Sequence, residues 1–290
     1  MLITMAERCI GSSHIKQNKP LQDYAAATSD RLRSYAYALV ADGHGGDKYI
    51  RSAKGSELAV RCAVDSINGV LKEILWDVTK KKKNLIEKNL KLICIKTSLS
   101  WKDAVIADYK ANPLSEEEIK FCESENIELP ENDEDIPVFY GSTLLAAVYL
   151  EHFDFWFTIQ IGDGKCAVIK NDLSVVFPEE LENEKLGFGI TTSLCNKEAA
   201  NEFRFAYGFE RIAGITVMSD GLADSFDNEK LPVFLGNIRQ NIVADSEKTI
   251  TELKEFMPKL SEQGSGDDIS IAGIFSKRRH DKKVNEQAVM

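Results

Sequence analysis

Four aspartates of this 290-residue chain stand at the ends of apolar runs that have the composition of β-strands. Asp42 follows YAYALVA, Asp163 follows FWFTIQIG, Asp220 follows GITVMS, and Asp267 stands just before DISIAGIF. One carboxylate in such a place is ordinary turn chemistry, but four of them on rigid elements could meet at one point. Crowded carboxylates repel one another unless they are protonated or hold cations. A metal site is therefore the first hypothesis.

Glycines beside two of these acids favour close approach of a ligand. Asp42 opens the sequence DGHGG, whose glycines let backbone carbonyls reach a bound group. The alternative is a tight turn with an aspartate cap, but His44 would have little apolar surface to pack against there, so we prefer the functional interpretation. Asp220 opens DGLAD, where capping of a helix start is an equal alternative. Asp224 would then follow one helical turn later.

The other candidates are less distinctive when each is taken alone. Asp163 lies in a GDG sequence that fits a hairpin turn, and Gln22-Asp23 fits a turn that opens the strand DYAAAT. Two adjacent acids at 267–268 are unfavourable at a strand start unless something binds one of them. Taken together, hard oxygen ligands without a Cys or His pair suit Mg²⁺ or Mn²⁺ better than zinc. Two such ions can acidify a water and clamp a phosphoryl oxygen, and a nearby histidine can protonate a leaving oxygen.

Hydrophobic periodicity predicts the elements that must position these residues. Residues 1–41 indicate short strands separated by the polar loop GSSHIKQNKPLQ, with SYAYALVA as a buried strand. Apolar residues at helical spacing predict a helix over 47–75 and a second long helix from Ile86 to Val105. The basic run KKKN at 81–84 is interpreted as a solvated connection between them and not as a binding patch.

The second half of the chain repeats this alternation of strands and helices. Four strand-like runs joined by turn sequences predict an antiparallel meander over 141–177. Residues 178–210 have no clear pattern, while AGITVMS and DISIAGIF predict two more strands. Helices are expected over 229–242 and 247–262. Hairpins combined with paired long helices are typical of an α+β fold with antiparallel sheets.

Two stretches depart from this pattern. Residues 113–137 are acidic and poor in apolar side chains, which predicts an exposed insert with a short helix from a capping box at Ser115. The insert could be a lid, a partner surface or a tolerated loop. The polar tail 276–290 predicts disorder. Because there is no internal repeat and no Gly/Ser linker, we expect a single domain over 1–275.

Composition and charge argue against several classes of function. A net charge of −10 and a pI of about 5.1 disfavour general binding to nucleic acid or to anionic lipid. The six cysteines form no CxxC pair, which predicts free thiols in a reducing compartment and no zinc site. The N-terminus lacks the features of a signal peptide, and no apolar run is long enough to span a bilayer. A cytoplasmic protein without a membrane or nucleic-acid partner is expected.

The order of the motifs resembles that of the type-2C, metal-dependent serine/threonine protein phosphatases. The motifs are GSSHIKQNKPLQDYA, ALVADGHGG, GSTLLAAVYL, IGDGKCAVI, VMSDGLADS and GDDISIAGI, which span roughly residues 8–275. Each motif is weak alone, whereas their order is specific. The resemblance implies a four-layer sandwich, with two facing antiparallel β-sheets between paired α-helices. It also implies hydrolysis of phosphoserine or phosphothreonine in proteins by a hydroxide that bridges two Mn²⁺ or Mg²⁺ ions, and a cognate kinase as a further partner.

The resemblance also implies roles for individual residues. By this resemblance, Asp42 bridges both metals and the carbonyl of Gly43 binds the second ion. Asp220 and Asp267 would hold the first ion. His44 matches the general acid that protonates the leaving oxygen.

Four further positions match outer parts of the family's site. Gln22 and Asp23 match an acidic pair that acts through metal-bound waters, and Asp163 and Asp224 match positions linked to a third, weaker metal.

Several departures from the family pattern affect the predicted site. Gln22 stands where the family usually has Glu, so one outer charge is missing, and GDG replaces the more usual GDS. His14 takes the place of an arginine that clamps the substrate phosphate, and a neutral imidazole holds phosphate less well than a guanidinium. Lys16 would lie on the same face as His14 if this segment is extended, and could compensate. The family's segment before the SDG strand is not recognisable in 178–210.

The sequence therefore leaves three functions open. The first is an active, metal-dependent protein phosphatase, because Asp42, Asp220 and Asp267 are all present. The second is a non-catalytic regulatory module on the same fold, which His14, Gln22 and the acidic insert suggest. The third is a metal hydrolase that acts on a small phosphorylated molecule.

Overall fold

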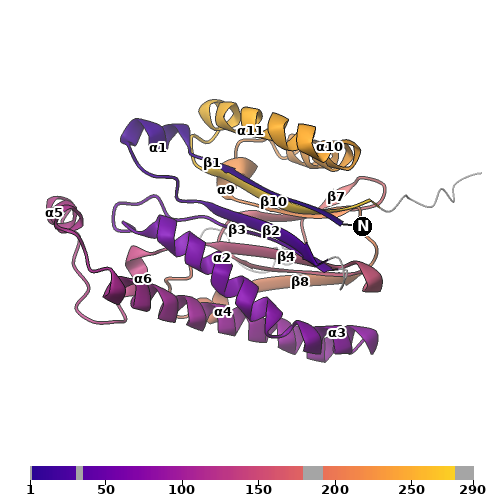
Figure 1. Cartoon of the computed structure of the whole chain (residues 1–290), viewed down its shortest axis with the longest axis horizontal. Coiled ribbons are helices and arrows are strands. Elements are labelled where there is room, and N and C mark those ends of the chain that lie inside the picture. Colours follow the sequence, from indigo (N-terminus) through magenta and orange to yellow (C-terminus); the bar gives the residue numbers. More distant parts are fainter. Residues whose placement is uncertain (1, 31–34, 179–191, 278–290) are drawn as a thin grey trace, which may run out of the picture.

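The computed structural model of the chain describes residues 2–30, 35–178 and 192–277, which form four layers (Figure 1). Two antiparallel five-stranded sheets face each other, and helices cover the outer face of each sheet. The sandwich that the motif order implied is therefore confirmed.

The first sheet has the strand order β1-β10-β9-β6-β7, and the second has the order β2-β3-β4-β5-β8. The strands of the first sheet are β1 Leu2–Cys9, β10 Ile269–Ser276, β9 Gly214–Met218, β6 Lys165–Ile169 and β7 Val175–Val176. Those of the second are β2 Tyr24–Asp30, β3 Tyr35–Ala41, β4 Leu144–Leu150, β5 Phe155–Ile161 and β8 Arg204–Phe209.

Residues along each central strand alternate between two cores. On β3, Ala36, Ala38 and Val40 face the other sheet, whereas Tyr35 and Leu39 face the helices. Such alternation follows from the two-residue period of a strand. Because both faces are buried, β4 and β5 have seven buried residues each, which explains why they read as continuous apolar runs.

Small side chains fill part of the space between the two sheets. Ala36 and Ala38 of β3, Ala147 of β4 and Ala272 of β10 are all fully buried in this core. The central strands of the two sheets therefore approach each other closely. Larger side chains fill the same layer beside the alanines, among them Tyr149, which pairs with Ala36, and Trp156, which pairs with Tyr149.

Two groups of helices form the outer layers (Figure 1). The helices over the second sheet are α2 Ser52–Asn68, α3 Leu71–Thr79 and α4 Lys83–Ala111; those over the first sheet are α10 Lys230–Ala244 and α11 Ser246–Gln263. The helices predicted over 229–242 and 247–262 and the long helix over 86–105 are confirmed. The helix predicted over 47–75 begins later and is interrupted at 69–70, where α2 ends and the chain turns into α3.

The antiparallel meander predicted over 141–177 is wrong in one respect. β4 pairs with β5, and β6 pairs with β7, but β5 and β6 belong to different sheets. The chain crosses between the sheets at Gly162–Gly164, where Gly162 has a φ of 111° that only glycine adopts readily. A short GDG link is compatible with a hairpin and also with this crossing, so the sequence alone did not distinguish them.

Three further segments differ from expectation or were not assigned. The predicted polar loop contains a short helix, α1 Ser12–Gln17, which ends at Asn18 in the left-handed conformation. The unassigned stretch 178–210 contains α8 Ala199–Glu202 and strand β8, while 179–191 lies outside the described residues. Ser276 belongs to β10, and residues 278–290 of the predicted disordered tail lie outside the described residues.

The acidic insert has the predicted short helix, and Arg51 attaches it to the body of the protein. Helix α5 Glu116–Ser124 begins with a complete capping box between Ser115 and Glu118. Arg51 donates from Nε and Nη2 to the two carboxylate oxygens of Glu118, at 2.8 and 2.9 Å. A short helix, α6 Ile136–Phe139, returns the chain to the core. The insert is thus an attached segment rather than a loose loop.

Two of the general expectations can be checked on the described residues. All six cysteines are free thiols in the structure. Within the described part of the chain, no helix has both the length and the apolar composition needed to cross a bilayer.

Candidate metal centre

Strand register places the predicted acids at one end of the sandwich. Tyr24 at the start of β2 pairs with Ala41 at the end of β3, so Asp23 and Asp42 are adjacent. In the other sheet, Met218 at the end of β9 pairs with Ile271 near the start of β10 and with the first residue of β6. Asp220, Asp267 and Asp163 therefore leave their strands at the same edge. Each sheet contributes part of the carboxylate cluster.

The buried centre of this cluster consists of Asp42, Asp23 and Asp220. Burial raises the pKa of Asp42 well above its ordinary value, and the charges of Asp23 and Asp220 raise it further. Burial also raises the pKa of Asp23 to about 7, although the nearby hydroxyl groups of Ser270 and Ser219 oppose the shift. The pKa of Asp220 is raised as well, chiefly by burial. Without cations, these carboxylates could not all be ionised at neutral pH without a large energetic cost.

Several buried oxygen atoms of this cluster have no hydrogen-bond partner among the described residues. They are Oδ1 of Asp220, Oδ2 of Asp23 and Oε1 of Gln22. Buried polar atoms are normally satisfied, so a group of oxygens without donors at one point calls for a ligand. Oxygen atoms are the ligands that Mg²⁺ and Mn²⁺ prefer. The residues present therefore fit a divalent-cation centre.

The backbone around Asp42 is fixed on both sides. The amide of Asp42 donates to Oγ1 of Thr143 at 3.0 Å, and the amide of Thr143 donates to the carbonyl of Asp42 at 2.8 Å. A Cβ atom on Gly43 would lie 2.7 Å from the carbonyl oxygens of Gln22 and Ser52, which explains the glycine at this position. The carbonyl of Gly43, a predicted ligand, is thus held on a rigid segment.

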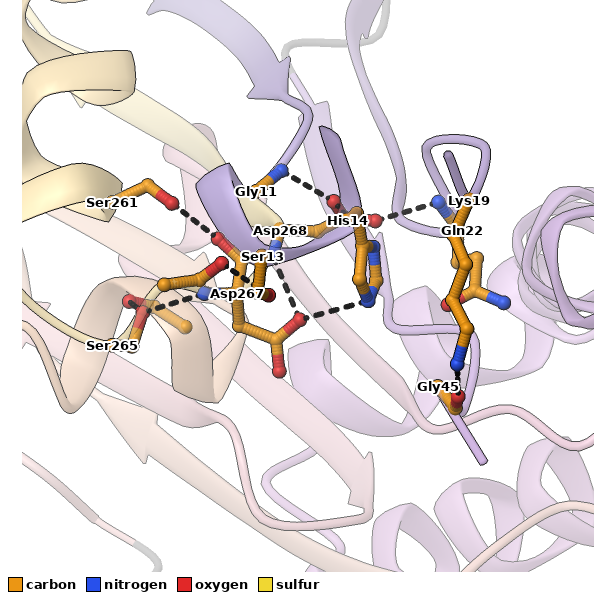
Figure 2. A network of polar contacts seen from close by, with 12 residues as sticks. Gly11, Ser13, His14, Lys19, Gln22, Gly45, Ser261, Ser265, Asp267 and Asp268 are labelled. Carbon is orange, nitrogen blue, oxygen red and sulfur yellow. Dashed lines mark hydrogen bonds and ion pairs between the residues drawn. The ribbon is translucent and has the colours of Figure 1, made fainter. Parts of the chain in front are cut away.

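Asp267 and Asp268 lie at the start of β10 and differ sharply in their surroundings (Figure 2). The Asp267 side chain is half exposed, with a relative accessibility of 50%, and could face a ligand from the solvent side. Asp268 is buried and accepts hydrogen bonds of 2.6 Å from the amides of Gly11 and Gln22. Asp268 therefore holds the segment before β2 against the start of β10.

Sequence reasoning did not assign a role to Asp268, although it noted that two adjacent acids at a strand start need a binding partner. The partners are two backbone amides and a histidine from a segment more than 240 residues away in the sequence. Only the tertiary structure identifies them.

His14 lies against this acidic pair rather than open to solvent. Its Nδ1 is 2.9 Å from Oδ1 of Asp268, and its Nε2 is 3.5 Å from Oδ1 of Asp267. Contact with Asp268 raises the pKa of His14 despite burial. Because His14 and Lys16 lie on the helix α1, they do not share the face that an extended segment would have given them. Two residues apart on a helix are about 200° apart around its axis, and Lys16 is exposed.

A different lysine reaches the glycine-rich loop. Lys19, which follows α1, donates from Nζ to the carbonyl of Gly45 at 2.7 Å and lies 3.3 Å from the carboxylate of Asp47 (Figure 2). This contact ties the segment after α1 to the DGHGG loop, which carries Asp42 and His44.

His44 is placed by contacts from three other segments. Its amide donates to the carbonyl of Gly141 at 3.1 Å, its ring lies 4.7 Å from that of Tyr49, and its Nε2 lies 2.7 Å from Oγ of Ser193. Burial lowers the pKa of His44, and the charge of Asp163 opposes this shift. Sequence reasoning missed Ser193, which lies in a stretch without a recognisable pattern.

The two positions predicted for a third metal differ in their relation to the centre. Asp163 is exposed, and its charge acts on both Asp220 and His44. Asp224 is exposed at the end of α9 Asp220–Ala223, and its amide donates to the carbonyl of Asp220 at 2.7 Å. Asp163 thus lies within electrostatic range of the cluster, whereas Asp224 is connected to it through the backbone of one helical turn.

Comparison with known proteins agrees with this arrangement. Residues 10–258 match the model of the family described as protein phosphatase 2C. No curated protein matches the chain significantly. Among solved structures, the chain is similar to a serine/threonine phosphatase of S. agalactiae at 16% identity, with 95% of this chain and 99% of that one covered and a TM-score of 0.51.

Two structures of the phosphatase PstP are similar to the chain to the same degree. The enzyme of Mycobacterium tuberculosis is 15% identical, with 96% of this chain and 99% of that one covered and a TM-score of 0.53. The catalytic domain of PstP in complex with two manganese ions is also 15% identical, with 94% and 97% covered and a TM-score of 0.50. At this level of identity, these similarities show a common fold.

Proposed function

The chain belongs to the protein phosphatase 2C family, and we propose that it hydrolyses phosphoserine and phosphothreonine in proteins with the help of two divalent cations. The observation that carries the proposal is the buried group of Asp42, Asp23 and Asp220, whose pKa values are all raised. Oδ2 of Asp23 and Oδ1 of Asp220 have no hydrogen-bond partner among the described residues, and bound cations would both satisfy these oxygens and relieve the repulsion. The PstP structure with two manganese ions supports the choice of metal, with Mn²⁺ or Mg²⁺ as the candidates.

We assign the metal ligands according to the family pattern and the geometry of the cluster. Asp42 would bridge both ions, the Gly43 carbonyl would bind the second, and Asp220 and Asp267 would bind the first. When bound, two such ions supply a water of lowered pKa and a clamp on the phosphoryl oxygens. The hydrogen bonds to Thr143 fix the backbone of Asp42, from which the side chain that would hold the ions extends.

Gln22 and Asp23 would act one layer farther out. The side chain of Gln22 is neutral, so it can orient a water but does not add charge. Asp23 is buried at the end of the sandwich where the two sheets meet, and its carboxylate belongs to the same cluster as Asp42 and Asp220. Asp163 and Asp224 remain the candidates for a third, weaker ion.

His44 is proposed to protonate the oxygen of the departing serine or threonine. Burial lowers the pKa of His44, so its protonated ring is a stronger proton donor than a free imidazolium. The contact of its Nε2 with Ser193 holds the ring in place. This serine is therefore a positioning residue for the proposed acid.

The decisive experiment measures phosphate release from a phosphothreonine peptide in the presence of Mn²⁺. We expect metal-dependent turnover, and a loss of about 100-fold or more in Asp42→Asn and in Asp220→Asn. The matched control is Asp77→Asn, which replaces a buried aspartate of α3 that accepts a hydrogen bond from Asn89 and is not part of the cluster. No turnover above the Asp42→Asn level would reject the proposed activity.

A specific observation favours the non-catalytic module as the second candidate. His14 takes the position of the phosphate-clamping arginine, and it is buried against Asp268 instead of being open to a substrate. Binding of Mn²⁺ without turnover of any phosphopeptide would support this candidate. Turnover of small phosphate esters but not of phosphopeptides would instead indicate a hydrolase of small molecules.

A further inference from the structure

Helix α4 has two apolar faces, and the sandwich uses only one of them. Its inner face contributes fully buried side chains to the core under the second sheet, namely Ile86, Leu90, Ile93, Trp101 and Val105. Four other large apolar side chains are exposed; we call them the outer stripe. They are Leu85, Leu92, Ile95 and Leu99, with exposures of 40%, 37%, 43% and 58%.

The spacing of the outer stripe is that of a helix–helix contact. Leu85, Leu92 and Leu99 repeat every seven residues, and Ile95 lies between the last two at a separation of three and four. This is the spacing of the a and d positions of a coiled coil. At about 100° per residue, the stripe lies on roughly the opposite side of α4 from the buried face. An amphipathic surface helix normally exposes polar residues there, so this second stripe needs a reason.

The stripe ends in a groove between the end of α3, the start of α4 and the short helix η1 Glu151–Phe153. This cavity has a volume of about 820 Å³, and we call it the Trp76 groove. Trp76 is 63% exposed there, and Phe153 is 39% exposed. Lys88 also lines the groove, between Leu85 and Leu92 of the stripe. The outer stripe therefore runs along α4, with Lys88 between Leu85 and Leu92, and it meets the groove at one end.

The charge along α4 beside the outer stripe is opposite to that of the whole molecule, whereas the Trp76 groove has a mixed lining that includes Glu73 and Asp77. Residues 80–96 contain seven lysines and one glutamate, within a chain of net charge −10. Lys88, Lys91 and Lys96 are all exposed beside the outer stripe. The one glutamate, Glu87, accepts a hydrogen bond of 2.9 Å from the hydroxyl of Tyr207. The surface thus combines apolar side chains at heptad spacing with flanking positive charge.

We propose that the outer stripe and the Trp76 groove bind an acidic amphipathic helix of a partner protein. Leucine-type side chains of that helix would pack on the outer stripe, one bulky side chain would enter the groove, and its flanking glutamates would face Lys88, Lys91 and Lys96. Flanking charges select partners in this way in helix pairs.

Charge argues against the two other occupants. In a second copy, α4 would bring lysines against lysines along the whole contact, which is unfavourable. An anionic membrane would attract these lysines but repel the rest of a molecule that is strongly acidic. A flat surface would also leave the Trp76 groove unfilled, whereas a helix can place a side chain in it.

The groove end of the proposed binding face lies far from the metal centre. Thr143, which bonds to Asp42, directly precedes β4, while η1 at the groove directly follows β4. The groove and the candidate metal centre therefore lie at opposite ends of the same strand. A bound helix would leave the carboxylate cluster open, so the partner would localise or recruit the protein without blocking it.

The experiment uses a designed, fluorescently labelled peptide of about four heptads, with Leu at a and d and Glu at e and g. We expect binding to the full chain with a Kd on the order of 10 µM or tighter, weakened by added salt. The double variant Leu92→Ser/Leu99→Ser should weaken binding at least about 10-fold, as should Lys88→Glu/Lys91→Glu. Val233→Ser is the matched control, because Val233 is also an exposed apolar side chain, at 62%, and lies on α10 in the opposite layer.

Four outcomes would overturn the proposal. The first is equal affinity for a peptide with Lys in place of Glu, and the second is unchanged binding by both double variants. The third is a dimer in light scattering that Leu92→Ser/Leu99→Ser dissociates, which would assign the stripe to a second copy. The fourth is binding to phosphatidylserine vesicles in preference to the peptide. Thermal melting of each variant verifies its fold, and none of these readouts depends on phosphatase activity.

Discussion

Removal of one buried charge from the acidic cluster should stabilise the metal-free protein. Asp23 is the best position for this test, because it is 1% exposed and its pKa is raised to about 7 from an ordinary value of 3.8. The variant Asp23→Asn keeps the size of the side chain. It also keeps an oxygen and an NH₂ group for the hydroxyls of Ser219 and Ser270, which lie near Asp23.

The size and pH dependence of the effect follow from this pKa. A shift of about three units at about 1.4 kcal/mol per unit makes the ionised Asp23 cost about 4 kcal/mol at pH 8. The folded state binds its proton more tightly than the unfolded state, so the metal-free wild type should lose stability as the pH rises from about 4 to about 7. Asp23→Asn should lack this loss. At roughly 2 °C per kcal/mol, its Tm at pH 8 should be higher by on the order of 5–10 °C.

The assay is thermal unfolding in EDTA and in excess Mn²⁺, at about pH 5 and about pH 8. Mn²⁺ should raise the Tm of the wild type more than that of Asp23→Asn, because the variant has less repulsion for the ions to relieve. Asp77→Asn, outside the cluster, should not raise the metal-free Tm at pH 8. The reasoning fails if Asp23→Asn melts at or below the temperature of the wild type in EDTA at pH 8 while its circular dichroism remains native.

Three further predictions concern the helices around the insert. Arg51→Ala should release the acidic insert, which would be seen as faster proteolysis within it. Arg51 lowers the pKa of Glu118, so the wild type should keep the insert attached above pH 4.5 and should release it as the pH falls through the lowered pKa of Glu118. An equal cleavage rate in both proteins would argue against this anchor. Gly55→Ala should destabilise by about 3 kcal/mol or more in urea unfolding, because the added Cβ would overlap the carbonyl of Tyr140; an unchanged midpoint would mean that α2 can shift. Trp101→Phe should cost about 1–3 kcal/mol in the same assay through loss of the buried 2.9 Å hydrogen bond to the Gly55 carbonyl, and a smaller change would show that this bond contributes little.

The sequence predicted the long elements because their signal is periodic and local. The inner face of α4 and the buried runs of β3, β4 and β5 are each visible within a short window. Sheet membership is not local. The runs that became β5 and β6 are separated by GDG, and only the packing of the whole chain decides whether that link makes a hairpin or a crossing between sheets.

The candidate site was predictable to the extent that its residues stand at strand ends. Asp42, Asp220 and Asp267 could be selected because each adjoins a recognisable strand. Asp268 and Ser193 could not, since their partners lie far away in the sequence. The prediction that His14 and Lys16 share one face was wrong because it assumed an extended chain, whereas this segment forms a short helix.

The alanines between the two sheets have a consequence for the cation centre. Asp23 and Asp42 are attached to one sheet and Asp220 and Asp267 to the other, so the gap across which they meet is the thickness of the layer that Ala36, Ala38, Ala147 and Ala272 fill. A row of methyl groups, remote from any ligand atom, thereby acts as the spacer of the carboxylates. Replacing one of these alanines by a larger residue would push the two sheets apart. The aspartates on one sheet would then move away from those on the other, although no ligand residue had been changed.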